Sequence, residues 1–334
     1  MGAHSIEITP LPFMLSRVAD SLYWMGRYLE RAEHTARVIN VYLDLMLDQS
    51  EQAAAQHRQH VLASLDLPID FDKAHTDYNL VQWLTFALDN ANAVRVCIGA
   101  ARENARQVRE QISTEMWEQI NQIYLFIEQV DMDAMWAAEP QEFYQNVKQG
   151  VHLFTGVTDS TMTHGQGWHF IQAGRYLERA IATSQLVDVY FSPGEYVPAV
   201  EAGQGRMAEH LLWLGVLRSC TAFEAYCKIY TADLDPRCIL EFLLLNSEFP
   251  HSVSYAVRNL QRALQGIAEA TQSSRAERAY RRAGRLQADL QYGQIDEILE
   301  GNLHPYFVNI QRQCTQIHDA IYQSYITYPI EGKL

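Results

Sequence analysis

The sequence predicts an all-α fold, a duplicated multi-helix bundle whose two halves are related by a pseudo-twofold axis. Apolar residues recur at the three- and four-residue spacing of an α-helix, whereas no stretch between prolines alternates as a β-strand does. The heptapeptide GRYLERA occurs twice, at 26–32 and at 174–180. We therefore expect an N-terminal extension over 1–13, a first helical half over 14–155 and a second half over 156–330, packed as one body.

The first helix is expected from Leu15 to Met46, because its apolar residues keep the three-four spacing for four heptads. These positions are Leu15, Val18, Leu22, Met25, Leu29, Ala32, Ala36, Ile39, Leu43 and Met46. The helix expected over 114–130 follows Ser113 and carries Glu115 in its first turn, where a carboxylate favours the helix N-terminus. The remaining helices are expected over 51–65, 79–88, 91–111, 142–155, 168–190, 206–230, 237–245, 252–270, 276–299 and 306–325, with loops over 155–167 and 192–205.

The two halves are related by a shift of 148 residues, which lays 26–42 over 174–190. Beyond the heptapeptide, the identical pairs are Thr35/Thr183, Val41/Val189 and Tyr42/Tyr190. A weaker likeness joins LTFALDNANAV at 84–94 to EFLLLNSEFPHSV at 241–253. The copies differ at Trp24/Gln172, Glu33/Ile181 and His34/Ala182. The polar residues of the heptapeptide are therefore retained where their neighbours have changed.

The composition excludes several classes of protein. Apolar residues make up 48% and charged residues 20%, so the chain has enough apolar surface to fold. A formal charge of −14 repels nucleic acid and anionic membranes, and it favours cationic or protein partners. We expect neither a signal segment nor a membrane-spanning run of about 18 apolar residues. Five cysteines without a CxxC pair indicate reduced thiols, so we expect a soluble cytoplasmic protein.

The polar residues of GRYLERA are the strongest candidates for a functional site. Leu29 lies in the heptad seam, whereas Glu30 and Arg31 lie outside it and would normally face solvent. Three explanations remain open: buried ion pairs across the pseudo-axis, a cleft for an anionic peptide, nucleotide or partner terminus, or catalysis by the carboxylates. The first would pair Glu30 with Arg179 and Glu178 with Arg31. The candidate cleft residues are Arg27, Glu30, Arg31, Arg175, Glu178, Arg179, Arg102 and Glu103.

No metal site and no cofactor are expected. Di-iron helical bundles use Glu-x-x-His on two helices, whereas Glu30 and His34 are four positions apart and the second copy has Ala182 in place of the histidine. The other histidines near the second copy, His152, His164 and His169, do not fall on a ligand spacing. The sequence contains no catalytic motif as clear as the repeat itself.

Two further segments are dense in arginine. Arg102 and Glu103 belong to ARENARQVRE at 101–110, for which an intrahelical salt-bridge lattice is the simpler interpretation. A second helix face carries Arg275, Arg278, Arg281, Arg282 and Arg285. This face is interpreted equally well as a basic docking stripe or as solvated surface. Nucleic acid is not the expected partner, because no aromatic stacking module is recognisable.

Four segments together resemble the bacterial alpha-E domain family. In order along 14–325 they are LSRVADSLYWMGRYLERAEHTARVI, ARENARQVREQISTEMWEQIN, LLWLGVLRSCTAFEAYCKIY and LEFLLLNSEFPHSVSYAVRNL. The resemblance implies an all-helical fold with a Glu-Arg signature, which maps onto Glu30 and Arg31 and is repeated at Glu178 and Arg179.

The resemblance also implies a role. Relatives are encoded beside, or fused to, an ATP-grasp ligase, often with a transglutaminase-like peptidase, and ATP-grasp ligases make amide bonds through acyl phosphates. We therefore expect a non-catalytic helical partner or substrate-presenting component of such a system. The alternative is an enzyme that uses the Glu/Arg cleft for acid-base or acyl-transfer chemistry. One departure is His251, where the family pattern has arginine, so no obligatory cation is expected there.

Overall fold

The computed structural model describes residues 14–45, 51–68, 74–192, 206–271 and 276–326. Throughout these residues the regular elements are helices, which confirms the expected all-α class. The expected extension over 1–13 and all but the first residue of the loop expected over 192–205 lie outside the described residues.

The helices up to the second GRYLERA copy are α1 (Ser16–Leu45), α2 (Glu51–Ser64), α3 (Asp77–Thr85), α4 (Val94–Gln107), α5 (Thr114–Glu128), α6 (Met132–Ala137) and α7 (Pro140–Thr161). Those that follow are α8 (Gln166–Phe191), α10 (Arg206–Ser219), α11 (Phe223–Tyr230), α12 (Pro236–Leu245), α13 (Val253–Thr271), α14 (Ala276–Tyr292), α15 (Ile295–Glu300), α16 (Leu303–Ile321) and the π-helical η1 (Tyr322–Ile326). Several begin at a side-chain cap, supplied by Thr76, Ser113, Asp131, Asp235 and Asn302.

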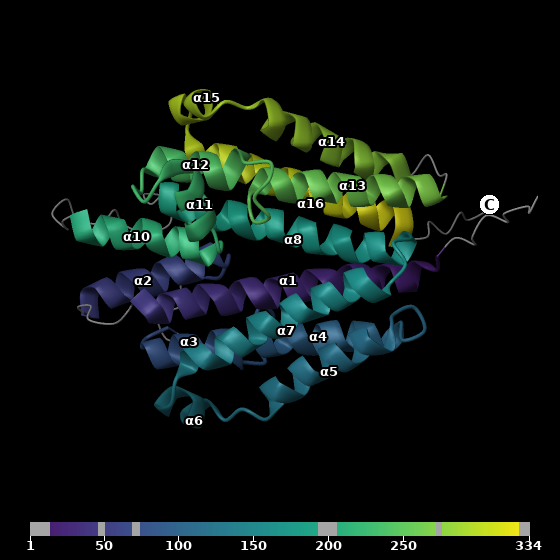
Figure 1. Ribbon diagram of the computed structural model, residues 1–334, viewed down its shortest axis with the longest axis horizontal. Helices are drawn as coiled ribbons and strands as arrows, with labels where there is room; N and C mark the ends of the chain where they lie inside the picture. Colours follow the sequence, from purple (N-terminus) through teal and green to yellow (C-terminus); the bar gives the residue numbers. More distant parts are fainter. Residues whose placement is uncertain (1–13, 46–50, 69–73, 193–205, 272–275, 327–334) are drawn as a thin grey trace, which may run out of the picture.

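Helices α1 and α8 lie side by side at the centre of the molecule and run in the same direction (Figure 1). Gly26 and Gly174 lie where the two helices touch. A Cβ atom at Gly26 would overlap the carbonyl oxygen of Ile171, and one at Gly174 would overlap that of Tyr23. The backbones are therefore in direct contact, which only glycine allows, and the side chains that flank the glycines are held between the helices.

The packing partners follow the same order in both halves. Helix α1 packs against α4 and α7, whereas α8 packs against α13 and α16. Helix α5 then joins α4 to α7, and α14 joins α13 to α16. Helices α2 and α10 cross over, α2 to α8 and α10 to α1. Because α1 is surrounded in this way, every residue from 32 to 43 is buried, including those on its polar face.

The loop expected over 155–167 is wrong for most of its length, because α7 continues to Thr161 and α8 begins at Gln166. Hydroxyls on α7 donate to carbonyls four residues back, from Thr155 to Val151, from Thr158 to Phe154 and from Thr161 to Val157. These bonds satisfy the threonines without interrupting the helix. The expected boundary between 155 and 156 consequently falls inside α7.

Two helices that were expected to be continuous are interrupted. The helix expected over 206–230 is divided into α10 and α11 near Thr221, whose φ of 51° is left-handed and ends a helix. The helix expected over 276–299 is divided into α14 and α15 next to Gly293, because glycine disfavours the helical interior. Helix α6 was not expected, since six residues are too few to show a hydrophobic period.

Candidate functional site

The signature residues lie between α1 and α8. The Glu30 carboxylate accepts two hydrogen bonds from Arg179, from Nε–H to Oε1 at 2.5 Å and from Nη2–H to Oε2 at 2.8 Å. Arg175 lies farther off, with 3.5 Å between its Nε and Oε2 of Glu30. We call Glu30, Arg175 and Arg179, together with the adjacent Gln172 and Thr155, the Arg175 cluster.

The second carboxylate is bonded by arginines of the other copy. Glu178 accepts hydrogen bonds from Nε–H of Arg31 at 2.6 Å and from Nε–H of Arg27 at 2.7 Å. The Arg27 guanidinium lies over the Trp24 ring, with 4.7 Å from its Cζ to the ring centroid. We call Glu178, Arg27, Arg31 and Trp24, together with His318 of α16, the Arg27 cluster.

The contacts of the two clusters correspond under the 148-residue shift. In each, the carboxylate of one copy is held by the arginine that follows the carboxylate of the other, Glu30 by Arg179 and Glu178 by Arg31. Both ion pairs that the sequence suggested are therefore present. A second arginine, which lies three residues before the carboxylate of its own copy, joins each cluster.

Both carboxylates are buried and ionised. The side chains of Glu30 and Glu178 are only 6% and 7% exposed. Burial alone would raise the pKa of each carboxyl, but the arginines outweigh it. The pKa of Glu30 is about 2, held there chiefly by Arg179, and the pKa of Glu178 is also lowered. Neither carboxylate is suited to proton transfer near neutral pH, because each stays charged and bonded to guanidinium groups.

The Arg27 cluster is closed by aromatic side chains of α1, α16 and η1. His318 Nδ1 lies 2.8 Å from the Tyr23 hydroxyl and 3.3 Å from Nη1 of Arg27. Because arginine only donates, this Nδ1 is an unprotonated acceptor. Burial and Arg27 lower the pKa of His318 to about 4, in agreement with a neutral ring. Trp24 completes the cover by donating its indole N–H to the Tyr322 hydroxyl.

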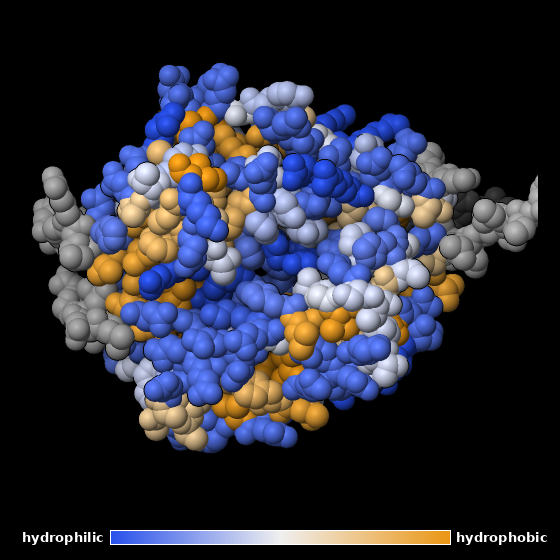
Figure 2. Space-filling view, viewed as in Figure 1, coloured by the Kyte–Doolittle hydropathy of each residue, from blue (hydrophilic) through white to orange (hydrophobic). Residues whose placement is uncertain are grey.

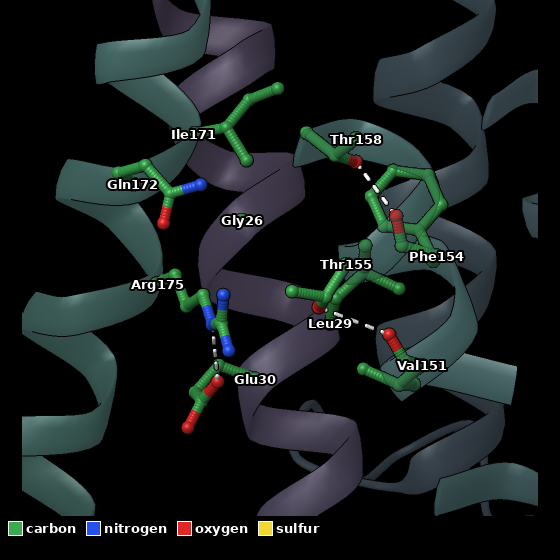
Figure 3. A pocket seen from close by; sticks show the side chains of 10 residues that line it. All are labelled: Gly26, Leu29, Glu30, Val151, Phe154, Thr155, Thr158, Ile171, Gln172 and Arg175. Carbon is green, nitrogen blue, oxygen red and sulfur yellow. Dashed lines mark hydrogen bonds and ion pairs between the residues drawn. The ribbon is translucent and has the colours of Figure 1, made fainter. Parts of the chain in front are cut away.

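The Arg175 cluster borders a small pocket between α1, α7 and α8 (Figure 3). Gln172 stands at the position that corresponds to Trp24, and Thr155 of α7 lines the opposite wall. The space open to water is about 20 Å³, enough for one or two small polar groups. The lining residues are Gly26, Leu29, Glu30, Val151, Phe154, Thr155, Thr158, Ile171, Gln172 and Arg175.

A further buried polar group lies close to the Arg175 cluster and was not expected. Arg37 is 2% exposed, pairs with Glu33 one turn earlier, and has its Nη1 3.2 Å from Nδ1 of His251. Nε2 of His34 is buried without a hydrogen-bond partner in the described part of the chain, and burial lowers the pKa of this histidine to about 4. The spacing of Glu33 and Arg37 was a signal for their ion pair, but not for its burial.

Two residues that were expected at the cleft lie elsewhere. Arg102 points toward α5, where it donates to Asn121 at 2.6 Å and lies over the Tyr124 ring, with 4.6 Å from Cζ to the centroid. Glu103 is exposed and pairs with Arg106 on its own helix. The physical reason is that α4 buries an apolar stripe, which turns the charged residues away from α1.

The second arginine-rich face lies on α14, which packs on α13 and α16 rather than on α1 or α8. Arg275 lies outside the described residues. Arg278, Arg281 and Arg282 have partners within the molecule, respectively Gln323, Glu277 and Gln316. Arg285 is exposed and has no such partner within the described ranges. The structure therefore does not bring this face together with the signature residues.

Among the residues with described positions, no group of three or more His, Cys, Asp or Glu side chains could hold a metal ion. No helix there combines the length and the apolar character needed to cross a bilayer. All five cysteines are free thiols, and Cys97, Cys220 and Cys314 are buried.

The chain is similar to two uncharacterized proteins, one of Mycobacterium bovis and one of Mycobacterium tuberculosis strain H37Rv, each 23% identical over 292 residues. The match covers 78% of this chain but 31% of each relative, so the chain spans about a third of their length. No solved structure matches.

A family described as "a predicted alpha-helical domain with a conserved ER motif" matches residues 14–326. Three Glu-Arg dipeptides lie in that range. Those at 30–31 and 178–179 form the two clusters, whereas the one at 277–278 is exposed on α14. The chain belongs to the Alpha-E family.

Proposed function

We propose that this chain is a non-catalytic helical component of an ATP-grasp-type peptide or amide ligase system, acting as the ligase's partner or presenting its substrate. The observation that carries the proposal is the state of the signature carboxylates. Glu30 and Glu178 are buried, ionised and each next to two arginines, which supports a role in packing α1 on α8. The alternative, an enzyme that works through these carboxylates, has no comparable support, because acid-base chemistry needs a group that titrates near the working pH.

The length of the mycobacterial relatives supports a role beside another protein or domain. Because the match covers 31% of each relative, the matched part is joined there to a longer stretch of sequence that lies outside the match. The partners that we propose are an ATP-grasp-type ligase and a transglutaminase-like peptidase of the same system. We propose a cytoplasmic location, where thiols stay reduced, since all five cysteines are free.

We also infer that the fold arose by duplication, with halves related by a pseudo-twofold axis. The support is the common order of packing partners and the corresponding arginine–glutamate contacts. Because α1 and α8 run in the same direction, the axis would lie along them. Superposition of α1 to α7 on α8 to α16 tests the duplication, and helices that failed to align in order would refute it.

The functional proposal is tested with the purified chain and the ATP-grasp-type protein of the same genome. With ATP and amino acids or peptides, the chain alone should neither form amide bonds nor release phosphate. It should bind the ligase in isothermal titration calorimetry, and docking through α14 should weaken as salt rises. ATP-dependent amide formation by the chain alone would refute the non-catalytic role.

The α14 face is tested separately by charge reversal. Arg281→Glu with Arg285→Glu changes exposed residues, so the fold should be retained while ligase binding weakens. The matched control is Arg106→Glu with Arg109→Glu, which makes the same charge change in the last turn of α4 and two residues beyond its end. Unchanged ligase binding by the α14 variant, or an equal loss in the control, would remove α14 from the interface.

A further inference from the structure

We infer that the Arg175 cluster binds a ligand carboxylate and that Arg175 is the residue that receives it. The inference rests on the proposed function for its purpose, because a carboxylate is the group that an ATP-grasp ligase would activate as an acyl phosphate. It therefore names the chemical class of the substrate that the chain would present. The site itself follows from the contacts of Arg175, from how the nearby charged groups are paired, and from a comparison with the Arg27 cluster.

Arg175 has unused hydrogen-bonding capacity. Its guanidinium lies over the Tyr176 ring, with 5.4 Å from Cζ to the centroid, and its one ionic contact among the described residues is the 3.5 Å approach of Nε to Glu30. The two oxygens of Glu30 already accept from Arg179. Nη1 and Nη2 of Arg175 have no hydrogen-bond partner within that part of the chain, and the side chain is 21% exposed. A planar guanidinium with free N–H groups matches the two oxygens of a carboxylate.

The pairing of the nearby charges leaves Arg175 available. Three guanidinium groups, those of Arg37, Arg175 and Arg179, lie in this region with the carboxylates of Glu30, Glu33 and Asp159. Arg179 holds Glu30, Arg37 holds Glu33, and Asp159 accepts from Trp168 and Gln172, so Arg175 is the cation that remains without a hydrogen-bonded counter-ion. The neighbouring histidines His34, His152 and His251 are neutral, because burial lowers the pKa of each ring.

The Arg27 cluster shows what a closed version of this site looks like. Arg27 corresponds to Arg175, but it is bonded to Glu178 at 2.7 Å and covered by Trp24 and His318. At the Arg175 cluster Gln172 replaces the tryptophan. Helix α7 contributes Thr155, which is smaller than the His318 that α16 contributes to the Arg27 cluster. The shared arginine is therefore satisfied by the protein in one cluster and left accessible in the other.

The pocket is large enough for one polar group of a ligand but not for a whole metabolite. In Figure 3, Gln172 and Arg175 extend from α8 into the space in front of Gly26, opposite α7. The hydroxyl hydrogens of Thr155 and Thr158 are used on α7 carbonyls, and Gln172 donates to Asp159, so the main available donor is the guanidinium of Arg175. About 20 Å³ accommodates a carboxylate group, and the rest of the ligand would lie outside. Figure 2 shows a hydrophilic depression across the middle of this face, between α7 and α13.

The test is a titration of the purified chain with carboxylate probes. Binding is monitored through the Nε–Hε signals of its arginines in NMR spectra. The probes are acetate, acetyl-Ala-Ala-Ala with a free carboxyl terminus, and the same peptide with an amidated terminus. We expect the free-carboxyl probes to shift the Arg175 signal saturably and the amide to bind about tenfold or more weakly, since hydrogen bonds to charged groups are strong. A higher affinity for the peptide than for acetate would identify a chain terminus as the ligand, whereas equal affinities would identify a small free carboxylate.

Two variants and a control separate this site from others. Arg175→Gln removes the cation, and Gln172→Trp introduces the residue that closes the Arg27 cluster, so both should weaken carboxylate binding about tenfold or more. Arg285→Gln removes an exposed arginine of α14 and should leave binding unchanged. Circular dichroism shows whether each variant is folded. If Arg175→Gln does not fold, Gln172→Trp alone tests the site.

Three results would overturn the inference: no saturable binding of either carboxylate, equal binding of the free and amidated peptides, or full binding by a folded Arg175→Gln or Gln172→Trp variant. Because the ligase takes no part in this experiment, such a failure would leave the proposed partnership to be decided by its own test. Failure of the partnership would likewise leave a measured carboxylate site intact.

Discussion

The Arg27 cluster and the Arg175 cluster are built from two copies of one heptapeptide but have different surroundings. Both contain a buried carboxylate held by an arginine of the other copy. Around Arg27 the free space is filled by Trp24, His318 and Tyr322, whereas around Arg175 a pocket remains. The arginine–glutamate pairs that both clusters share join α1 to α8. The side chains that differ around the second arginine decide whether it is available to a ligand.

This comparison separates two reasons for retaining a charged residue. A carboxylate between packed helices requires a cation, because an unpaired buried charge costs several kcal/mol or more. Glu30 and Arg179 meet that requirement together, so their retention follows from packing alone. Arg175 is not required in the same way, since Glu30 already accepts two hydrogen bonds from Arg179. A change at Arg175 should therefore affect binding more than stability.

The largest effect is expected when one signature carboxylate is neutralised. Glu30→Gln or Glu178→Gln leaves buried arginine without its counter-ion, and the free energy of unfolding should fall by about 3 kcal/mol or more. Urea unfolding measures the loss. Glu103→Gln is the control, because its pair with Arg106 is exposed and its loss should leave the free energy of unfolding almost unchanged. If both signature variants unfold like the unmodified chain but lose a ligand or the ligase, the signature is a binding site instead.

A second effect concerns pH. His34 has a pKa of about 4 in the fold against its usual 6.5, so between these values the unfolded chain binds a proton that the folded chain does not. Stability should therefore fall as the pH is lowered from 6.5 to 4, by on the order of 3 kcal/mol.

The lowered pKa of Glu30 acts at a lower pH. Its contribution is fully present above about 4.5 and is lost as the pH falls toward 2. Unfolding curves of His34→Ala, which carries the residue of the second copy, should be flatter between pH 6.5 and 4. An unchanged slope in this variant would assign the acid sensitivity to other groups.

A smaller loss is expected where the two central helices touch. Gly26→Ala and Gly174→Ala each place a methyl group against a carbonyl of the opposite helix, and such overpacking costs about 1–3 kcal/mol. Gly156→Ala on α7 is the control, because a Cβ there meets nothing within 4 Å. Thermal unfolding should show this control to be as stable as the unmodified chain or more stable, since alanine favours a helix. A stable Gly174→Ala variant would contradict the close contact.

The smallest effect is expected from exchanging the residues that distinguish the clusters. Trp24→Gln removes the cover over Arg27 and should cost about 1–2 kcal/mol, from the lost cation–π contact and indole packing. Gln172 is only 4% exposed but borders the pocket, so Gln172→Trp can place part of its ring there and should change stability by less. Urea unfolding of both variants measures the difference. Equal losses would mean that the two positions have the same surroundings after all.

The fold class could be predicted from the amino-acid sequence, and the main ion pairs could be suggested from it. The three-four spacing of apolar residues predicted α1, because helix formation depends on local periodicity. As one of three explanations, the repeat of GRYLERA suggested that Glu30 would meet Arg179 and that Glu178 would meet Arg31, since a carboxylate retained between helices needs a cation of suitable geometry. These inferences needed only neighbouring residues and one internal comparison.

The tertiary structure decided which polar residues are buried and which arginine is available. The heptad pattern placed the polar face of α1 toward solvent, yet α4, α7, α8 and α10 cover the helix on all sides. Arg37 and His34 are buried for this reason, and α4 turns Arg102 away from the clusters. The pocket at Arg175 depends on what α7 and α16 place over equivalent residues. Such contacts join residues more than a hundred positions apart, and no local pattern specifies them.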